Sequence, residues 1–582
     1  MSKRLQHLLL CCAAANLAVV VWDLATGGIY FDIHGFVFSS WEIAKPVRYA
    51  AVCTAVALWL HDRGAATTSW DLIPRFSAHA ACALACASII TAGLFGIRAA
   101  GGADAFGYVS QAQLWTDGRL IAPDPLAPLA RDIGGAVAPL GYAMARAGDA
   151  SMTMRHALVP TYPPGLPLTM SLAQRLAGRQ AVYSVVPLLG GLAVWMTYLI
   201  GLRVADGRTG LVAALLVAFS PLFMFQTFEP MSDIPATAWW TTAWAMSLVP
   251  GEWSAFGAGM SVAVAVLTRP NLAPLALVLL PVIASSRPRR TRVLLFTATA
   301  AAGCAVVGAF NAALYGSPFT SGYGPLDQFF DRDHLMPNLA HYTRWMIQLH
   351  TPLLLLAVIA PLARLNRIVL WMWIFCFALG LSYAFYLVFD QWPFARFLLP
   401  SLPLLFVLVA IALLRAIAAL PVAVRGALTL AVCVYLATSY AIVGARLGIF
   451  TVGRAEQRYA TVGRHLGDTL PPSAVVLSMI ESGSVRWHGG RLTVRWDFIP
   501  PDRLDATVAL LRSRGYLPYI LLEDWEEPLF RRQFAETNVL GRIDWPPSLE
   551  YQGAGRVRLY CVAERERYLS GEPVATVPIA EP

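Results

Sequence analysis

The sequence predicts a mainly α-helical protein that crosses a membrane many times and ends in a small soluble α/β domain. Of its 582 residues, 57% are apolar and only 14% are charged, whereas a soluble globular protein carries about 25% charge. The apolar residues are concentrated in runs of about 20 residues, the length that an α-helix needs to cross a bilayer. This pattern excludes an ordinary soluble enzyme and a disordered chain.

About thirteen apolar runs are candidates for membrane spans. The first begins near Leu8 and resembles a signal peptide, but no convincing cleavage site follows it, so we expect it to be retained as a span. We divide the chain into additional N-terminal helices (1–75), a helical membrane domain with long outer loops (76–450) and an α/β domain (451–582). The other runs are 47–61, 76–97, 181–201, 209–226, 234–250, 254–268, 270–286, 293–315, 352–364, 368–388, 398–420 and 426–447.

The arginines predict the orientation of these helices. The chain has 44 Lys+Arg against 35 Asp+Glu, a net charge of +9. With the amino terminus inside, most of the loop arginines lie on the inner face, including Arg203, Arg208 and the run 287–292, as the positive-inside rule requires. An odd number of spans then places the tail outside, together with four polar stretches, 98–180, 227–233, 316–351 and 389–397.

The tail has the pattern of a soluble α/β domain. Residues 454–470 and 501–514 are typical of helices, and 474–477 and 519–522 of strands. Gly515 stands where a helix C-cap belongs. The sequence has no Gly-x-Gly-x-x-Gly, no P-loop and no basic stripe with interleaved aromatic residues, so nothing predicts a nucleotide site or a nucleic-acid partner. We expect the tail to contribute no residue to the chemistry.

Four groups of residues in the outer stretches carry candidate chemistry, and the first surrounds Asp104. It reads Gly101-Gly-Ala-Asp104-Ala-Phe-Gly-Tyr108 and directly follows an apolar run. An Asp in this place, followed by an aromatic residue one helical turn later, can form a fixed carboxylate at the membrane surface. The alternative is that Asp104 only caps the following helix, because Asp favours the N-cap.

The second and third groups are a proline turn and an acidic hairpin. Tyr162-Pro-Pro-Gly predicts an extended turn that aims the Tyr162 side chain, or simply a turn that leads into a helix. Glu229 and Asp233 fall in a very short outer hairpin between apolar helices. Two carboxylates in that position need water or a cationic partner. Alternatively, the hairpin is solvated and Asp233 caps the next helix.

The fourth group is cationic or polar. Arg269 and Arg396 lie at the outer ends of apolar helices, where an arginine either snorkels to lipid headgroups or holds an anion by forked hydrogen bonds. The loop around Tyr323 adds aromatic and hydroxyl groups that suit a sugar pocket, or it is a rigid turn. The remaining members of the group are His341, Arg344 and His350.

All four groups share one predicted face of the membrane. Carboxylates and guanidinium groups above helices that could enclose an acyl chain favour a reaction joining a hydrophobic phosphate carrier to a polar acceptor. Two other interpretations stay open, a structural membrane protein and a transporter or flippase. A transporter should show ionisable residues or broken helices near the bilayer midplane and a repeat between its halves, but charges within the runs are scarce and no repeat is seen.

The order of these motifs resembles that of the GT-C glycosyltransferases, in particular the protein O-mannosyltransferase and aminoarabinose-transferase branch (glycosyltransferase family 39-like). The resemblance covers approximately residues 76–450. It rests on the early acidic motif, the Pro-Pro turn, the second acidic loop and the late Arg-Phe-x-x-Pro. The segments that look like bacterial members are Tyr162-Pro-Pro-Gly-Leu-Pro167, Met231-Ser-Asp-Ile-Pro235, Leu267-Thr-Arg-Pro-Asn271 and Tyr315-Gly-Ser-Pro-Phe319.

This resemblance implies a GT-C fold and a polyprenyl-phosphate-linked sugar as donor. It also implies a glycan, lipid or protein as acceptor, and transfer at the outer face of a bacterial inner membrane, usually with inversion. Asp104 would be the general base, and Glu229 or Asp233 a second acidic site that positions the acceptor or binds a divalent cation. Arg396, with Arg269, would neutralise the departing phosphate.

The remaining expected roles and two departures complete the comparison with the family. If a metal ion takes part, Asp104 and Asp233 are its expected ligands. Ala105 stands where many relatives have Glu, and Tyr162 where some have a phosphate-binding lysine, so phosphate binding would depend on arginine. The other expected substrate-binding residues are Tyr108, Tyr162, Tyr323, Arg344 and His350.

Overall fold

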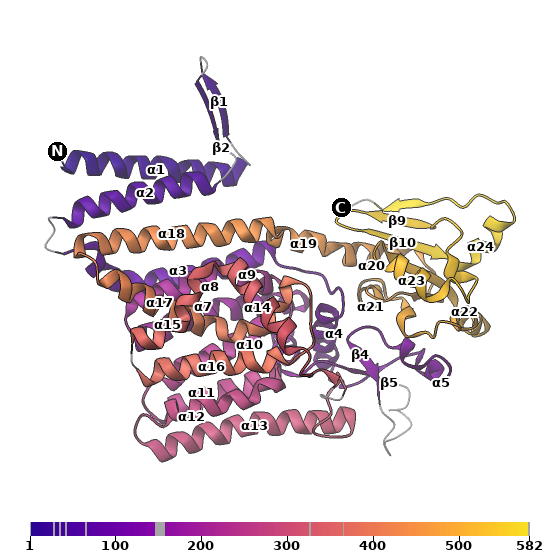
Figure 1. The fold of residues 1–582 in the computed structure, drawn as a ribbon. Helices are drawn as coiled ribbons and strands as arrows, with labels where there is room; N and C mark the ends of the chain where they lie inside the picture. Colours follow the sequence, from indigo (N-terminus) through magenta and orange to yellow (C-terminus); the bar gives the residue numbers. More distant parts are fainter. Residues whose placement is uncertain are drawn as a thin grey trace.

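The computed structural model shows a bundle of long helices with an α/β domain at one end (Figure 1). It describes residues 2–26, 29–33, 36–40, 43–63, 67–145, 157–324, 328–364 and 366–579. The N-terminus lies at the end of the bundle opposite to the α/β domain (Figure 1). The main helices of the bundle are α1 (Ser2–Thr26), α2 (Ala44–Asp62), α3 (Ser69–Phe95), α4 (Asp104–Thr116), α6 (Gly165–Ala177), α7 (Val185–Val204), α8 (Gly207–Phe219), α9 (Pro221–Phe228), α10 (Asp233–Ser247), α11 (Glu252–Thr268), α12 (Ala276–Ile283), α13 (Arg289–Tyr315), α14 (Leu335–His350), α15 (Leu356–Ala363), α16 (Arg367–Ala384), α17 (Leu402–Ala418) and α18 (Val422–Arg446).

Seven helices in the described residues are long and apolar enough to cross a membrane, or up to nine if each of two bent pairs is one span. The expected thirteen spans are therefore not confirmed. One reason is that the runs 209–226 and 352–364 belong to the bent pairs, α8–α9 (58°) and α14–α15 (116°). The runs 254–268 and 270–286 form shorter apolar helices. The seven helices are Arg4–Asp23, Ser69–Phe95, Arg179–Val204, Arg289–Tyr315, Arg367–Ala384, Trp392–Ala418 and Val422–Arg446.

Small residues and aromatic side chains hold the bundle together. A Cβ atom on Gly303 of α13 would lie 2.5 Å from the Cα atom of Ala263 on α11, so the glycine lets the two helices approach closely. On α10, Trp240 and Trp244 are fully buried and both pack against Phe375 of α16. The extra N-terminal helices lie outside this core: α1 contacts α2, which contacts α18, and the hairpin β1 (Ile29–Ile33) and β2 (Phe36–Ser40) joins α1 to α2.

The tail folds as an α/β domain around a six-stranded sheet with strand order β11-β9-β10-β8-β6-β7. Strand β6 pairs parallel with β7 and β8, β11 pairs parallel with β9, and β10 pairs antiparallel with β8 and β9. The elements are α19 (Val452–Ala455), α20 (Gln457–Thr469), β6 (Ala474–Leu477), α21 (Ser482–Gly489), β7 (Leu492–Val494), α22 (Leu504–Ser513), β8 (Leu517–Glu523), α23 (Glu526–Phe534), β9 (Leu549–Gln552), β10 (Arg556–Cys561), α24 (Val562–Leu569) and β11 (Val577–Ile579).

The secondary structure expected for the tail is confirmed. The strands predicted at 474–477 and 519–522 correspond to β6 and β8, and the helices predicted at 454–470 and 501–514 correspond to α19–α20 and α22. Gly515 follows the end of α22 with a φ of +82° and donates its N–H to the carbonyl of Arg512 at 3.0 Å. This is the left-handed helix ending that favours glycine.

The first long loop of the membrane domain completes the core of the tail. Its short elements η1 (Ala127–Leu129), α5 (Ala130–Ile133) and η2 (Gly134–Val137) place apolar side chains in one buried cluster with strands β6 and β8 and helix α23. Asp124 of the loop forms an ion pair with Arg486 of α21, and an Nη2 N–H of Arg486 donates to the carbonyl of Val137 at 3.0 Å. Packing therefore joins the loop to the tail across the expected boundary at residue 450.

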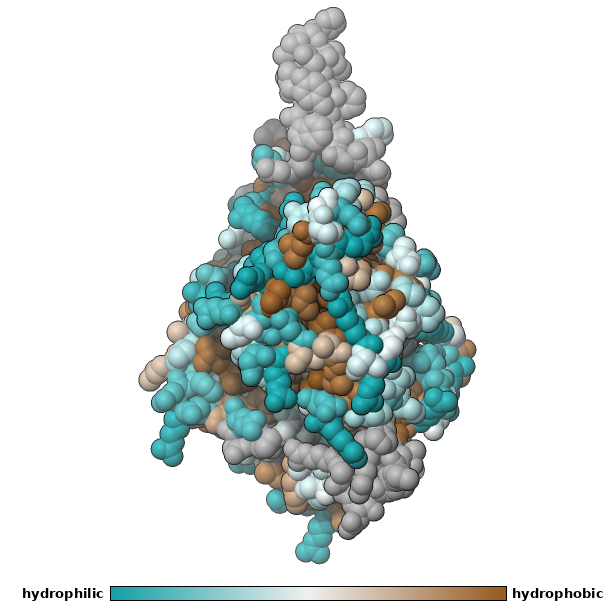
Figure 2. Space-filling view, turned by 90° about the vertical axis from the view of Figure 1, so that its right-hand side faces the viewer, coloured by the Kyte–Doolittle hydropathy of each residue, from teal (hydrophilic) through white to brown (hydrophobic). Residues whose placement is uncertain are grey.

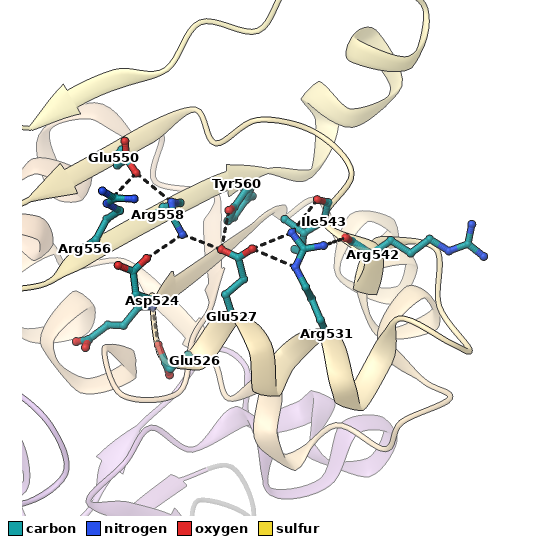
Figure 3. A network of polar contacts seen from close by, with 11 residues as sticks. Asp524, Glu526, Glu527, Arg531, Arg542, Ile543, Glu550, Arg556, Arg558 and Tyr560 are labelled. Carbon is teal, nitrogen blue, oxygen red and sulfur yellow. Dashed lines mark hydrogen bonds and ion pairs between the residues drawn. The ribbon is translucent and has the colours of Figure 1, made fainter.

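The outer end of the tail is polar and rich in ion pairs. Seen end-on, this face of the molecule is mostly hydrophilic, with scattered apolar patches (Figure 2). In the tail, the Glu527 carboxylate accepts hydrogen bonds from Arg531, Arg558 and Tyr560 (Figure 3). Arg558 also pairs with Asp524 and Glu550. These contacts tie α23 to the sheet.

Candidate active site

Asp104 is the first residue of α4, and the tail supports the turn in front of it. A Cβ atom on Gly101 would lie 2.0 Å from a ring carbon of Tyr459 on α20, so only glycine fits between the turn and that ring. The backbone N–H of Ala100 donates to Nε2 of His488 on α21 at 3.2 Å. Burial and the nearby Arg464 and Arg179 lower the pKa of His488 to about 4, so His488 is the neutral acceptor that this hydrogen bond requires.

The Asp104 carboxylate faces two partners from distant parts of the chain. Tyr162 donates its hydroxyl to Oδ1 at 2.6 Å, and Arg396 donates an Nη1 N–H to Oδ2 at 3.1 Å. The side chain makes no capping hydrogen bond with α4, whose N-cap is Ala103. The interpretation of Asp104 as a simple helix cap is therefore wrong, because both of its oxygens are directed to these tertiary contacts.

Tyr162 lies where the Pro-Pro turn leads into α6, and it is 3% exposed. Its ring packs against Tyr108 and Tyr323 at centroid distances of 4.5 and 5.7 Å. Gly107 makes room for it, since a Cβ there would lie 2.1 Å from the ring. Burial, together with the Asp104 carboxylate, raises the pKa of Tyr162 well above its ordinary value, so its hydroxyl stays a neutral donor to Asp104.

A second ion pair lies beside the first. Arg269, between α11 and the turn that follows it, donates an Nη2 N–H to Oδ1 of Asp233 at 2.5 Å and its Nε N–H to Ser232 Oγ at 3.4 Å. Asp233 is the first residue of α10, and its side chain is 1% exposed. The guanidinium carbons of Arg269 and Arg396 lie 5.7 and 5.5 Å from the centre of the Phe397 ring. Both cations therefore lie near the same aromatic ring.

Both ion pairs line one cavity of about 310 Å³, called here the Asp104 cavity. Three buried polar atoms of its lining residues have no hydrogen-bond partner among the described residues: Oδ2 of Asp233, Nη1 of Arg269 and Nε of Arg396. A buried polar atom without a partner is costly, so the cavity is suited to a polar, anionic ligand. The lining residues are Asp104, Tyr108, Pro163, Met231, Ser232, Asp233, Thr268, Arg269, Pro270, Asn271, Ser321, Tyr323, Phe329, Phe330, Tyr383, Tyr386, Phe389, Phe394, Arg396 and Phe397.

The structure thus brings together most of the residues singled out in the sequence. The Asp104 cavity also contains groups that the sequence analysis did not select, chiefly Asn271, whose Nδ2 donates to the Tyr383 hydroxyl at 2.8 Å, and the aromatic side chains between 383 and 397. Asn271 stands two residues after Arg269 in a segment that already resembled the family. The aromatic side chains gave no signal, because Tyr383 and Tyr386 stand in an apolar run and the other three stand beside it, where aromatic residues are ordinary core residues.

Three of the expected site residues lie elsewhere. Glu229 lines a different cavity, and Arg344 is exposed on α14. His350 is fully buried, where Nε2 pairs with Ser220 Oγ at 2.7 Å and Nδ1 with the carbonyl of Met346 at 3.2 Å. His350 therefore lies at the break between α14 and α15, away from the Asp104 cavity, as a hydrogen-bonded residue of the core.

The residues present do not fit a divalent metal ion. Asp104 and Asp233 are each neutralised by an arginine, and a guanidinium group beside a carboxylate opposes a bound cation. Within the described ranges, no three His, Cys, Asp or Glu side chains are grouped as metal ligands.

The fold is that of the GT-C glycosyltransferases, which confirms the resemblance expected from the sequence. Residues 161–311 match the family model described as dolichyl-phosphate-mannose-protein mannosyltransferase. These residues include the Pro-Pro turn, both residues of the acidic hairpin and Arg269. No curated protein matches the chain.

Among solved structures, the chain is similar to ArnT from Cupriavidus metallidurans bound to undecaprenyl phosphate, at 13% identity and a TM-score of 0.52. This similarity covers 83% of this chain and 98% of ArnT. The oligosaccharyltransferase from Archaeoglobus fulgidus has 12% identity and a TM-score of 0.49, over 82% of this chain and 73% of that one. The arabinofuranosyltransferase AftD from mycobacteria has 17% identity and a TM-score of 0.44, over 76% and 35%.

Proposed function

We propose that this protein is a membrane glycosyltransferase that transfers a sugar from a polyprenyl-phosphate carrier to a hydroxyl group of a glycan, lipid or protein. The observation that carries the proposal is the Asp104 cavity, where a carboxylate and two arginines with unpaired N–H groups meet. Two comparisons add support: the match to the mannosyltransferase model and the shared fold with an ArnT structure that holds undecaprenyl phosphate.

In this proposal, Asp104 acts as the general base. Its side chain is 30% exposed, so an acceptor hydroxyl can approach it within the cavity. As the acceptor oxygen bonds to the anomeric carbon of the sugar, Asp104 takes the hydroxyl proton and the bond between that carbon and the phosphate oxygen breaks with its electron pair leaving on the phosphate. A positioned base of this kind contributes about 10²–10⁴-fold to the rate. Attack opposite to the leaving phosphate inverts the anomeric centre.

Arg396 and Arg269 are placed to hold the departing phosphate. The negative charge grows on that phosphate as the bond breaks, so cationic groups already fixed beside the cavity stabilise the transition state more than the ground state. Arg396 retains an unpaired Nε N–H while it contacts Asp104, and Arg269 retains an unpaired Nη1 N–H while Asp233 fixes its other side. Asp233 therefore has a positioning role and leaves Oδ2 free to accept a sugar hydroxyl.

The reaction is proposed to take place on the extracytoplasmic side of a bacterial inner membrane. Helix α4, which begins with Asp104, lies at the end of the bundle that carries the tail, and the N-terminus lies at the opposite end (Figure 1). With the amino terminus inside, as the arginine distribution predicts, the cavity and the tail face outward. The aromatic side chains of the cavity offer flat apolar surfaces against which a sugar ring can pack.

The test is transfer of a labelled sugar from undecaprenyl phosphate by the full-length protein in proteoliposomes. We expect Asp104→Asn to lower the rate by about 10²–10⁴-fold without changing the melting temperature by more than a few degrees. Asp117→Asn, at the exposed far end of the same helix, is the matched control and should retain full activity. Full transfer by Asp104→Asn would exclude it as the base. Movement of the carrier lipid across the bilayer without any transfer would indicate a flippase instead.

A further inference from the structure

A second cavity, called here the Glu229 cavity, lies where three candidate spans end. Its volume is about 450 Å³. One span ends at Phe95, one begins at Arg179, and the bent pair ends at Phe228. The cavity is lined by residues at each of these ends, among them Ile89 and Arg98 at the first, Tyr183 and Leu188 at the second, and Glu229 after the third. Such a position corresponds to the headgroup level of a bilayer.

The polar side of the Glu229 cavity contains groups that lack partners. Among the described residues, neither the Glu229 carboxylate nor the Tyr183 hydroxyl has a hydrogen-bond partner, although both side chains are partly buried. Burial, reinforced by the negative charge of Glu456, raises the pKa of Glu229 to about 8. A cation held beside this carboxylate would favour its charged form. The unpaired oxygens of Glu229 and Tyr183 can therefore accept hydrogen bonds from a positively charged group of a ligand.

The same cavity has a basic group and an apolar side. Arg98 is exposed at the rim and uses one Nη2 N–H for the carbonyl of Gly93 at 2.7 Å. Below the rim, Leu188 is 54% exposed, and Ile89 and Val186 extend the apolar wall toward the membrane interior. A ligand that fits carries an anionic group for Arg98, a cationic group for Glu229 and an apolar chain for the wall at Leu188, because these are the groups that the cavity can satisfy.

We propose that the Glu229 cavity binds a bilayer phospholipid whose headgroup carries a primary ammonium group. The ammonium donates hydrogen bonds to Glu229, the phosphate lies near Arg98, and an acyl chain follows the wall at Leu188. This ligand is distinct from the sugar carrier, which has a phosphate but no ammonium group to match Glu229.

The bound lipid would also support the Asp104 cavity. The loop 229–233 separates the two cavities: Glu229 and Pro230 line the lipid site, while Met231, Ser232 and Asp233 line the Asp104 cavity. A lipid that fixes Glu229 therefore limits the movement of the loop that carries Asp233.

The test measures lipid retention by the full-length protein in native mass spectrometry, with phosphatidylethanolamine, phosphatidylcholine and phosphatidylglycerol offered in equal amounts. The wild type should retain phosphatidylethanolamine preferentially. Glu229→Gln should lower this retention about tenfold, the loss expected for one charge-assisted hydrogen bond. Glu252→Gln, an exposed carboxylate at the start of α11, is the control and should behave as the wild type.

A second variant guards against misfolding of Glu229→Gln. Tyr183→Phe removes only a hydroxyl from the same cavity and should lower the retention about threefold. Unchanged retention in both variants would overturn the proposal, as would equal retention of all three lipids by the wild type. Displacement of phosphatidylethanolamine by an equal amount of undecaprenyl phosphate would overturn it too, since the cavity would then belong to the sugar carrier.

Discussion

Two clusters of carboxylates and guanidinium groups in this protein differ in how completely their members are paired. In the tail, the Glu527 carboxylate accepts four hydrogen bonds from Arg531, Arg558 and Tyr560 and lies between a helix and a sheet (Figure 3). In the Asp104 cavity, Asp233, Arg269 and Arg396 each keep one buried polar atom unpaired. Similar residue types therefore serve two purposes.

The comparison shows which charges are available for chemistry. A fully paired cluster stabilises the fold and has nothing left to offer a ligand. An incompletely paired cluster destabilises the folded protein. Around a cavity, a bound ligand can offset this destabilisation by supplying the missing hydrogen bonds. Counting charged residues in the sequence cannot separate these two cases, since the difference lies in the geometry of their partners.

The largest expected effect comes from removing one cation of the incompletely paired cluster in the Asp104 cavity. Arg396→Ala should lower transfer by about 10²–10³-fold, the range found when one donor to a developing negative charge is lost. It should also weaken binding of the carrier phosphate more than binding of the acceptor. Isothermal titration of each substrate separately checks this. Acceptor binding that weakens more than donor binding would assign Arg396 to the other substrate.

A smaller loss is expected when the support of Asp104 is disturbed from the tail side. Gly101→Ala places a methyl group against the Tyr459 ring and should displace Asp104. Transfer should fall by about 10- to 100-fold, because misplacements of about 1 Å have effects of that size. Tyr459→Ala in the same chain should restore part of the activity. Gly380→Ala, where a Cβ atom meets nothing within 4 Å, is the control. Full activity of Gly101→Ala would show that the tail does not position the base.

In the fully paired cluster around Glu527, a substitution should instead change the stability of the tail and leave the transfer rate unchanged. Glu527→Gln removes the negative charge and one of the two acceptor oxygens and should destabilise the tail by about 1–2 kcal/mol, since the side chain is 16% exposed and partly screened. Transfer at a temperature well below unfolding should not change. Denaturation followed by hydrogen exchange in β8 and β10 measures the first effect. A large loss of transfer with an intact tail would contradict the division between the two clusters.

A further expected effect is a pH dependence of the stability of the tail. Burial raises the pKa of Glu481 to about 8 from an ordinary value of 4.5. The folded tail therefore keeps a proton that the unfolded chain releases between about pH 4.5 and 8, so stability falls as pH rises through that window. Glu481→Gln should flatten this slope in hydrogen exchange of β6 measured from pH 5 to 8. The exposed Glu536→Gln should keep the wild-type slope, and an unchanged slope in Glu481→Gln would contradict the assignment.

Much of the site could be predicted because its residues stand in short, ordered motifs. Asp104, Tyr162, Asp233, Arg269 and Arg396 were each selected from turns next to apolar runs, and the structure gathers all five. Their pairing could not be predicted, because Asp104 and Arg396 are 292 residues apart. The sequence also could not separate Glu229 from Asp233. Glu229 and Asp233 are four residues apart in a short loop, but they line different cavities.

The fold class and the α/β character of the tail followed from periodicity, but the number of spans and the role of the tail did not. Breaks at Ser220 and Thr351 bend two helix pairs, and hydropathy alone cannot detect such bends. None of the described residues that line the Asp104 cavity belongs to the tail. However, Tyr459 and His488 contact the turn that precedes Asp104, so the tail supports the position of this turn.

The shared core of the first loop and the tail determines how this protein can be recombined with its relatives. Leu126, Leu129 and Ile133 are packed among side chains of the tail sheet, more than 300 residues away in the chain. A chimera that exchanges the tail alone would leave these side chains facing a foreign surface. The exchangeable module is therefore discontinuous and consists of the loop around 124–137 together with the residues after 451.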